Sequence, residues 1–340
     1  MALTNLDRTF IIAELSANHA QRKEIAIESI KAAKNAGADA IKLQTYKPDT
    51  MTLESDNQYF QITEGLWKGQ HLYQLYKEAY TPWEWHEDLF NTAKEEGIIC
   101  FSTPFDRTAV DFLERFNPPA YKIASFELVD IPLIRYTASK NRTMIMSTGI
   151  AKFHEIEDAI NACREVGNND IFLLKCTSSY PAPLSEVNLA TMLDLKKQFN
   201  VDVGLSDHTE GIIAPIVATA LGARIIEKHF IMNKEIGGPD ASFSLDEMEF
   251  GKMVEAVRKA ESVYGKVSYE LTEKVKLNRK FSRSLFIVKD VKEGEVFTLD
   301  NVKSIRPNYG MEPKYIDEII GEKATRDISK GTPFTRDLIQ

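Results

Sequence analysis

Between Phe10 and Tyr264 the sequence repeats one unit, a short apolar run followed by a longer amphipathic segment. Such alternation predicts parallel strands that each lead into a covering helix. We count eight predicted strands: Thr9–Glu14, Asp39–Gln44, Ile98–Ser102, Ala120–Ile123, Met144–Ser147, Ile171–Lys175, Asp202–Leu205 and Ile225–His229. Eight βα units in about 255 residues match a closed (β/α)8 TIM barrel. An open doubly wound sheet is the alternative, but no G-x-G-x-x-G turn follows the first run.

One connection is longer than the short loops that usually join such units. Residues 47–81 separate the second predicted strand from a helix that we expect to begin near Pro82. In a barrel, a long segment after a strand lies over the active-site mouth, so this connection is a candidate lid or specificity loop. Among the side chains that it carries are Trp67, His71, Tyr73 and Tyr76. For most of them, packing on the barrel rim is the simpler interpretation.

The pattern changes after Tyr264. We predict a barrel domain at residues 1–265, a charged helical linker at 266–281 and a small domain of short strands and turns at 282–340. A domain of about sixty residues holds only a thin apolar core. We therefore expect this last domain to lean on the barrel or on a second subunit.

Composition narrows the class of protein. Lys and Arg total 42 against 50 Asp and Glu, a net charge of −8, and no long basic run offers a nucleic-acid surface. The three cysteines have no paired short spacing, which favours free thiols in a reducing compartment. The N-terminus lacks a basic segment followed by an apolar run, and the longest apolar stretch, Ile212–Ala223, is too short to span a bilayer. We expect a soluble cytoplasmic protein without nucleic-acid or membrane partners.

Polar residues gather at the ends of all eight predicted strands, where barrel enzymes carry their active sites. In chain order they are Glu14, Asn18 and His19; Lys42 and Gln44; Ser102 and Thr103; Lys122 and Ser125; Ser147 and Thr148; Thr177 to Tyr180; Ser206, Asp207 and His208; and Glu227, Lys228 and His229. Each alone is explained as a polar cap. Eight of eight predicts an active site at this end of the barrel.

Two histidines at neighbouring strand ends predict a metal site. His208 and His229 end the seventh and eighth strands, so their imidazoles are expected to share one divalent ion. Glu14 lies on the next strand of the closed ring, and Asp240 lies in the following loop. Two nitrogen ligands leave positions open for substrate and water, as in a catalytic Lewis acid. Mixed imidazole and oxygen ligation favours manganese, with cobalt, zinc and magnesium as open alternatives.

Two lysines are expected inside the same mouth. Lys42 and Lys122 end the second and fourth strands, where an unpaired ammonium is costly to bury, so we predict an anionic ligand. Hydroxyl and backbone donors near Ser102, Ser147 and Ser206 suit a phosphate at helix N-termini. Two alternatives stay open: each lysine pairs with a local carboxylate, or one forms a Schiff base as in class I aldolases.

A series of ordered motifs then resembles a known family. In order the sequence contains FIIAELSANHA, AGADAIKLQTY, FSTPFD, PAYKIASFE, MIMSTGI, LLKCTSSYPAP, VGLSDHT, GARIIEKHF and GGPDASFS. These segments resemble the sialic acid synthase family along the whole barrel. The tail RSLFIVKDVKEGEVFTLDNVKSIRPNYG resembles the family's small C-terminal SAF domain, which is similar to type III antifreeze proteins.

The resemblance implies roles for individual residues. It implies manganese held by His208 and His229, with Asp240 beside the sugar and the metal. The residues that match the phosphoenolpyruvate site are Lys42, Ser102, Lys122, Ser125, Ser147 and Ser206. Ser178 stands where neuraminate synthases carry an Asn that contacts the sugar. The resemblance also implies a homodimer whose exchanged C-terminal domains each send Arg306 into the partner's active site.

The implied reaction joins phosphoenolpyruvate to an amino-sugar aldehyde. C3 of phosphoenolpyruvate attacks the aldehyde, water adds at C2 with Glu14 as general base, and phosphate leaves by C–O cleavage without a lysine imine. AELSANHA, GLW with LYQLY, and SFSLDEMEF resemble the pseudaminic acid branch of the family, whose sugar is 2,4-diacetamido-2,4,6-trideoxy-L-altrose. The neuraminic and legionaminic acid branches are the alternatives. The branch implies a bacterial surface-glycan or flagellin-glycosylation pathway.

Some side chains near the predicted mouth receive weaker assignments. A pocket lined from Trp67, Tyr73 and Tyr180 would suit the apolar end of this sugar. His19 is a candidate for positioning the sugar. His86 and His154 fall on predicted helices and are expected at the surface, and Cys176 is expected to be a packed thiol.

Overall fold

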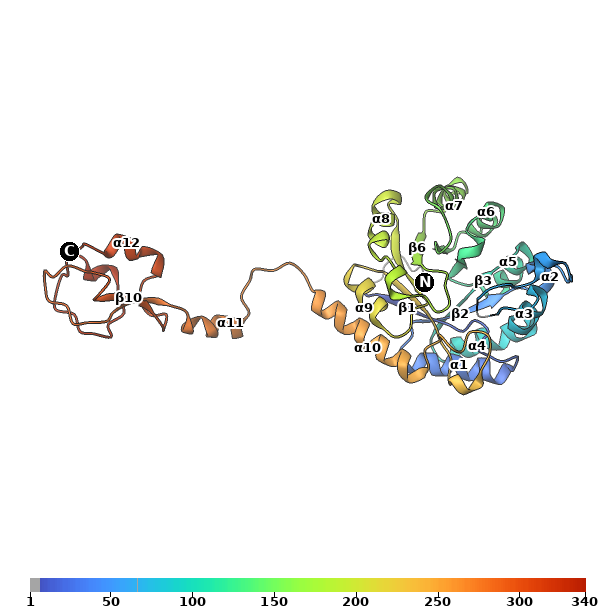
Figure 1. The fold of residues 1–340 in the computed structure, drawn as a ribbon, viewed down its shortest axis with the longest axis horizontal. Helices are drawn as coiled ribbons and strands as arrows, with labels where there is room; N and C mark the ends of the chain where they lie inside the picture. The colour runs from blue at the N-terminus through green and yellow to red at the C-terminus, as the bar shows by residue number, and fades with distance from the viewer. Residues whose placement is uncertain (1–6, 66) are drawn as a thin grey trace. The chain divides into compact units, whose positions relative to one another are not determined.

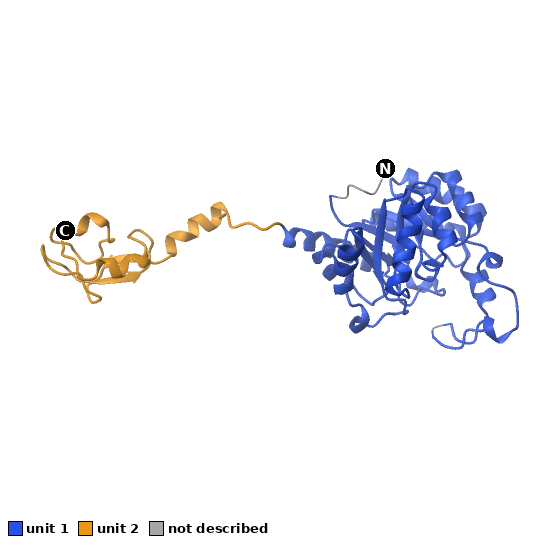
Figure 2. Ribbon diagram, turned by 90° about the horizontal axis from the view of Figure 1, so that it is seen from above, with its two compact units in different colours: residues 1–265 blue, residues 266–340 orange. Residues whose placement is uncertain are grey.

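The structure is a computed structural model that describes residues 7–65 and 67–340. It divides the chain into two compact units, residues 1–265 and 266–340, which are coloured separately in Figure 2. The GLW stretch quoted above includes Leu66, which lies outside the described residues, as do residues 1–6. Among the described residues, no helix is long and apolar enough to cross a membrane.

The first unit is a closed barrel of eight parallel strands, which confirms the predicted fold class (Figure 1). The strands are β1 (Phe10–Glu14), β2 (Ala40–Thr45), β3 (Ile99–Pro104), β4 (Ala120–Ile123), β5 (Thr143–Ser147), β6 (Ile171–Cys176), β7 (Asp202–Asp207) and β8 (Ile225–His229). Closure is made by β1 and β8, which pair from Phe10 with Ile225 to Glu14 with His229. This register places the ends of β1 and β8 side by side.

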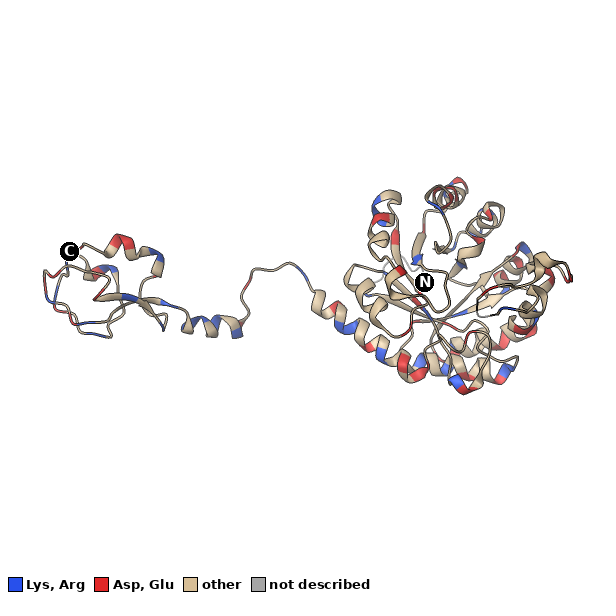
Figure 3. Cartoon of the chain, viewed as in Figure 1, with Lys and Arg blue, Asp and Glu red and all other residues tan. Residues whose placement is uncertain are grey.

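Helices surround the barrel and alternate with its strands. They are α1 (Lys23–Asn35), α4 (His86–Glu95), α5 (Arg107–Leu113), α6 (Ile131–Ala138), α7 (Phe153–Glu165), α8 (Ala190–Phe199), α9 (Ile213–Ala220) and α10 (Glu247–Tyr264). Several begin at an acidic N-cap, as when the Asp106 carboxylate accepts from the backbone of Thr108 and Ala109. Basic and acidic residues are mixed along α10 and the helices beside it (Figure 3).

The barrel interior changes character along its axis. Alternate strand residues point inward, and at the N-terminal end of the barrel they form an apolar layer of Phe10, Ile12, Ala40, Phe101, Ala120, Ile145, Phe172, Leu174 and Ile225. Gly204 is required on β7 because a Cβ there would overlap the carbonyl oxygen of Ile225. Towards the C-terminal ends of the strands, the inward positions become polar and charged.

The long connection has structure of its own. Within it lie α2 (Pro48–Met51) and α3 (Leu72–Ala79), so it is more helical than the loop we predicted. Tyr76 packs edge-on against Tyr46 at the end of β2, with ring centroids 5.9 Å apart. That contact agrees with the interpretation that some of its aromatic side chains pack the connection onto the rim.

The second unit has a separate apolar core. Residues 266–281 include α11 (Glu273–Asn278), and the remainder contains the antiparallel pair β9 (Ser284–Ile287) and β10 (Val302–Ile305) with α12 (Ile316–Ile319). Phe297 and Phe334 meet at its centre with ring centroids 4.9 Å apart. The core is formed within the unit by Leu285, Ile287, Val291, Phe297, Val302, Ile319, Ala324, Ile328, Phe334 and Leu338.

Candidate active site at the barrel mouth

Four ionisable side chains meet inside the barrel above the apolar layer. Glu14, Lys42, Lys122 and Glu227 come from β1, β2, β4 and β8, and each is between 2% and 5% exposed. The Lys42 Nζ forms an ion pair with the Glu14 carboxylate and lies 3.9 Å from Glu227 Oε2. Lys122 Nζ lies 3.5 Å from Glu227 Oε1. Each lysine therefore has a local carboxylate partner, which is one of the alternatives that the sequence left open.

The two carboxylates of this charged layer differ in proton affinity. Burial raises the pKa of Glu14 to about 7, against the opposing effect of Lys42, and the charge of Glu227 adds to the rise. Burial also acts to raise the pKa of Glu227, but Lys122 and Lys42 outweigh it and lower that pKa. Glu227 is thus the permanent anion, whereas Glu14 can gain or lose a proton near neutral pH.

Hydroxyl groups line the same space. Lys42 Nζ donates to Thr103 Oγ1 at 3.1 Å, and Ser206 Oγ donates to Glu227 Oε1 at 2.9 Å. The Ser147 hydroxyl is buried and has no hydrogen-bond partner in the described part of the chain. A buried polar atom without a partner is costly, so an oxygen-rich ligand would satisfy it. The donors occupy strand ends; α7 begins only at Phe153, so Ser147 is not at a helix N-terminus as predicted.

Ser102 does not face this space. Its hydroxyl is fully buried on the outer side of the barrel wall and bonds to Thr45 Oγ1 at 2.7 Å. Thr45 in turn bonds to His86 Nε2 at 2.7 Å. Neighbouring residues of a strand point to opposite faces, so Thr103 is the hydroxyl of β3 that reaches Lys42. Ser102, which was predicted to contact the ligand, is therefore one residue away from the inward-facing position on β3.

Gly149 brings three further side chains together. A Cβ at this position would overlap the Ser178 hydroxyl and would lie 2.8 Å from Ser125 Oγ and 3.1 Å from Cys176 Sγ. The Gly149 backbone N–H also donates to Ser125 Oγ at 3.1 Å. Ser125 and Ser178, both predicted substrate-binding residues, therefore adjoin each other across β4 and β6, and Cys176 is buried between them.

The two predicted metal-binding histidines are neighbours. The rings of His208 and His229 have centroids 5.3 Å apart. His208 Nδ1 donates to the carbonyl oxygen of Thr177 at 3.0 Å, which leaves the lone pair on Nε2. Burial, helped by the charge of His208, lowers the pKa of His229 well below its ordinary value, and the buried His229 Nδ1 has no hydrogen-bond partner among the described residues.

This donor set fits a divalent metal. Imidazole binds metals through an unprotonated nitrogen, and the candidate ligand atoms here are His208 Nε2 and the ring nitrogens of His229. Across the described residues, no group of three or more His, Cys, Asp or Glu is arranged to hold an ion. A metal at the pair would therefore depend on substrate or water for its other ligands.

Asp240 is connected to the charged layer through two polar side chains. Ser16 Oγ donates to Asp240 Oδ2 at 2.5 Å, and Gln44 Nε2 donates both to Ser16 Oγ at 2.9 Å and to Glu14 Oε1 at 3.1 Å. Ser16 has a φ of 47°, in the left-handed region that residues other than glycine rarely adopt. Asp240 Oδ2 also lies 3.9 Å from His229 Nδ1, so the chain of contacts runs from Glu14 to the histidine pair.

Aromatic rings form the other side of the site. The Tyr180 ring lies 4.3 Å from the His208 ring and 5.3 Å from the Phe243 ring. Trp67, from the long connection, lies 5.8 Å from Tyr180 and donates its Nε1 hydrogen to the carbonyl oxygen of Pro239 at 3.3 Å. Tyr73 instead donates to Asp49 at 2.9 Å within the connection, so the structure does not bring it to Tyr180.

Two other histidines are buried outside the mouth. His86 is fully buried against Phe112, so the prediction that it lies at the surface is wrong; α4 packs its first turn onto β2 and β3. His154 is exposed, as expected. His19 is buried beside Trp85 and bonds to Thr81; within the described part of the chain it has no contact with the charged layer that would support the predicted role in positioning the sugar.

Sequence reasoning gave no role to three residues that adjoin the site. Glu227 was noted at a strand end only, yet it stands two residues before His229, and that spacing turns both inward. Glu127 follows Ser125, and burial raises its pKa to about 7 while Lys122 opposes the rise. Thr103 was considered with Ser102 as a hydroxyl donor, but only Ser102 was assigned to the substrate. Strand alternation was the signal that could have identified Glu227 and favoured Thr103.

Arg306 is exposed in the second unit, and the positions of the units relative to each other are not determined.

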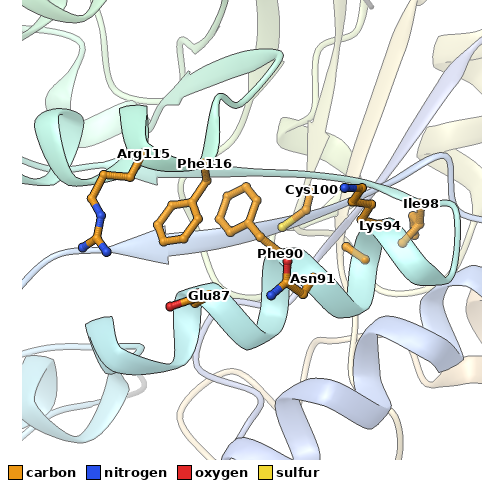
Figure 4. A pocket seen from close by; sticks show the side chains of 9 residues that line it. Glu87, Phe90, Asn91, Lys94, Ile98, Cys100, Arg115 and Phe116 are labelled. Carbon is orange, nitrogen blue, oxygen red and sulfur yellow. The ribbon is translucent and has the colours of Figure 1, made fainter.

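A surface pocket of about 540 Å³ lies beside the start of β3, away from the C-terminal ends of the strands (Figure 4). Its lining residues are Glu87, Phe90, Asn91, Ala93, Lys94, Ile98, Cys100, Arg115 and Phe116.

Comparison with known proteins decides the family. The model of the NeuB family matches residues 29–269, and that of the SAF domain matches residues 282–340. The chain belongs to the NeuB family. Enzymes of this family depend on a metal. The sequence motifs had indicated this family, and both matches confirm it.

Individual relatives of this NeuB family member cover nearly all of it. The pseudaminic acid synthase of Campylobacter jejuni serotype O:2 is 53% identical over 324 residues, covering 95% of this chain and 94% of that protein. The pseudaminic acid synthase of Helicobacter pylori is 47% identical over 331 residues, covering 97% of both chains. The crystal structure of the Bacillus subtilis spore coat polysaccharide biosynthesis protein spsE is 33% identical and superposes with a TM-score of 0.66, covering 98% of this chain and 95% of that one.

Proposed function

We propose that this chain is a pseudaminic acid synthase. It condenses phosphoenolpyruvate with 2,4-diacetamido-2,4,6-trideoxy-L-altrose and water, and it releases pseudaminic acid and phosphate. The observation that carries the proposal is the joint presence of the charged layer and the histidine pair in a chain about 50% identical to two pseudaminic acid synthases. N-acetylneuraminate and legionaminate synthases are the alternatives within the family.

The lysines and hydroxyls suit phosphoenolpyruvate. Lys42 and Lys122 provide cationic donors in a buried site, where the interaction with phosphate and carboxylate oxygens is stronger than in water. Ser147 supplies a hydroxyl without a partner, and Ser125 and Ser206 extend the row of donors. We assign Thr103 to this group in place of Ser102, because only Thr103 contacts Lys42.

The histidine pair suits the aldehyde of the sugar. A divalent metal held by His208 and His229, most favourably manganese with cobalt or magnesium as alternatives, supplies a Lewis acid for the aldehyde oxygen. Asp240 holds the sugar side of the pocket through Ser16 and adjoins His229. Ser178 and Tyr180 border this part of the site and are proposed to contact the sugar.

Glu14 is the proposed general base. After C3 of phosphoenolpyruvate attacks the aldehyde, water must lose a proton as it adds at C2. A carboxylate whose pKa is raised by burial to about 7 accepts that proton more readily than an exposed one, and Lys42 and Gln44 hold it in place. The tetrahedral intermediate then loses phosphate by C–O cleavage. Both lysines stay ion-paired donors, and neither needs to form an imine.

The second unit is proposed to complete the site from a partner. In a homodimer with exchanged C-terminal domains, the exposed Arg306 would add a third cation for substrate oxygens. We take residues 1–265 as the catalytic domain, 266–281 as the linker and 282–340 as the SAF domain. The cytoplasm is the proposed compartment, because phosphoenolpyruvate is made there and the three cysteines are free thiols.

The test is phosphate release from phosphoenolpyruvate with manganese present. The trideoxy altrose aldehyde is compared with its mannose counterpart from the legionaminic series and with N-acetylmannosamine, each with and without a chelator. We expect chelator-sensitive release with the altrose sugar. Preference for either other sugar would move the chain to another branch of the family. Covalent trapping by borohydride on Lys122 would instead support the Schiff-base aldolase.

A further inference from the structure

Trp67 is fixed at the mouth of the barrel by two contacts. Its Nε1 hydrogen is donated to the Pro239 carbonyl oxygen, directly before Asp240, and its ring faces Tyr180 at 5.8 Å. The long connection that carries it is therefore joined to the loop after β8 at the point where that loop enters the site. Tyr59, also on the connection, is 79% exposed, and no contact of its ring with the site is found among the described residues.

Trp67, Tyr180 and Phe243 together make an aromatic wall. Phe243 lies 5.0 Å from His229, Tyr180 lies 4.3 Å from His208, and Trp67 extends the wall one ring farther from the histidines. The charged layer of Glu14 and Lys42 is the polar part of the same site, and Gln44, Ser16 and Asp240 connect it to His229. A substrate that contacts both parts meets polar groups in one and apolar rings in the other.

The wall has little capacity to bind a hydroxyl group at its outer end. An indole has one donor and no acceptor, and the donor of Trp67 is already used by Pro239. A hydroxyl placed against this ring would lose its water without gaining a partner, whereas a methyl group would lose nothing. If the aldehyde is held at the histidine pair, the far end of an open-chain sugar extends away from it.

We propose that Trp67 is a specificity-determining residue, whose ring selects a 6-deoxy amino-sugar by packing on its methyl end. This inference rests on the proposed function and deepens it. The role belongs to the ring, and the hydrogen bond to Pro239 only holds the ring in place.

The experiment separates the ring from the hydrogen bond. Trp67→Phe keeps a ring without the donor, and Trp67→Gln keeps an amide donor without the ring. Tyr59→Ala, on the exposed part of the same connection, is the matched control. Each protein is assayed with phosphoenolpyruvate, manganese, the trideoxy altrose aldehyde and its counterpart that differs only by a hydroxyl at C6. Where the hydroxylated sugar does not react, its inhibition constant takes the place of its KM.

We expect the wild-type chain to prefer the 6-deoxy sugar by roughly 10-fold to 200-fold, the range that one methyl-sized difference supports. Trp67→Gln should lose at least about 10-fold of that preference through a higher sugar KM. Trp67→Phe should keep most of it, Tyr59→Ala should keep all of it, and the KM for phosphoenolpyruvate should not change. Should the Gln variant not fold, Trp67→Ser removes the ring in the same way.

Three results would overturn the inference: no wild-type preference for the 6-deoxy sugar, a preference retained by Trp67→Gln, or a preference lost equally in Trp67→Phe. If Trp67→Phe loses the preference as fully as Trp67→Gln, Trp67 only anchors the long connection. A parallel rise in the KM for phosphoenolpyruvate would also indicate an anchoring role. If the wild-type chain releases no phosphate with the altrose sugar, the proposed function fails instead. The two failures are therefore distinct.

Discussion

The two ends of the barrel interior lie on the same eight strands but differ in the chemistry of their inward side chains. At the N-terminal end the inward residues form an apolar layer that includes Phe101 and Ile145. At the C-terminal end they form the charged layer of Glu14, Lys42, Lys122 and Glu227. The first layer removes apolar surface from water and stabilises the fold. The second is costly to bury, and the catalytic role proposed for it would explain why it is present.

The strongest test of this difference removes one cation from the charged layer. Lys122→Met should lower kcat/KM by about 10³-fold or more, because a buried donor to developing phosphate charge is lost. Some stability should also be lost, because the buried Glu227 loses its nearer cation and keeps only Lys42 at 3.9 Å, so kcat/KM is measured at a temperature at which the variant is folded. The measurements are phosphate release and thermal unfolding, with the surface variant Lys196→Met as control. Full activity in Lys122→Met would show that this layer is structural.

The second test creates a cavity in the apolar layer. Phe101→Ala should lower the free energy of unfolding by about 3 to 5 kcal/mol, because it leaves a cavity in a closely packed interior. The folded protein should keep its kcat/KM at low temperature. Denaturant unfolding measures the loss, and Tyr264→Ala, at a site 70% exposed, is the control for deleting an aromatic ring. Equal activity losses in Phe101→Ala and Lys122→Met would mean that the two layers are not separable.

A pH experiment tests two histidines that are buried outside the charged layer, His19 and His86. Burial lowers the pKa of His19 and of His86 to about 4, with His86 adding to the effect at His19. The unfolded chain binds these protons near pH 6.5 and the folded chain does not, so stability is lost as pH falls from about 6.5 to 4. Each histidine accounts for at most roughly 3 kcal/mol of that loss. His86→Gln should flatten the curve of unfolding free energy against pH in this window, and the exposed His154→Gln should leave it unchanged.

The smallest effects are expected on β3, where Thr103 faces the barrel interior and Ser102 faces outward. Thr103→Val should raise the KM for phosphoenolpyruvate by about 5-fold to 10-fold, the value of one typical hydrogen bond. Ser102→Ala should keep activity within about 2-fold and cost about 1 kcal/mol of stability, because its hydroxyl bonds only within the wall. The opposite pattern would return Ser102 to the ligand and contradict the assignment of Thr103.

Much of the fold could be predicted because strands and helices are encoded locally. Apolar runs such as Ile171–Lys175 and Ile225–His229 match β6 and β8 to within a residue. Counting eight of them was sufficient for the closed barrel. The neighbouring positions of His208 and His229 followed from the order of the strands around the ring. The helices inside residues 47–81 were missed, although the helical spacing of Leu72, Leu75 and Tyr76 was a signal that could have identified α3.

The sequence by itself determined the barrel, the end of it that carries the site, and the residue types gathered there. Only the tertiary structure decided that Thr103 and not Ser102 faces Lys42, that His86 is buried, and that Trp67 reaches Pro239. Periodicity is a property of residues that are close in the chain, so it can be recognised from the sequence. These three outcomes depend on strand phase and on contacts between residues far apart in the chain, which appear only when the barrel closes and its helices pack.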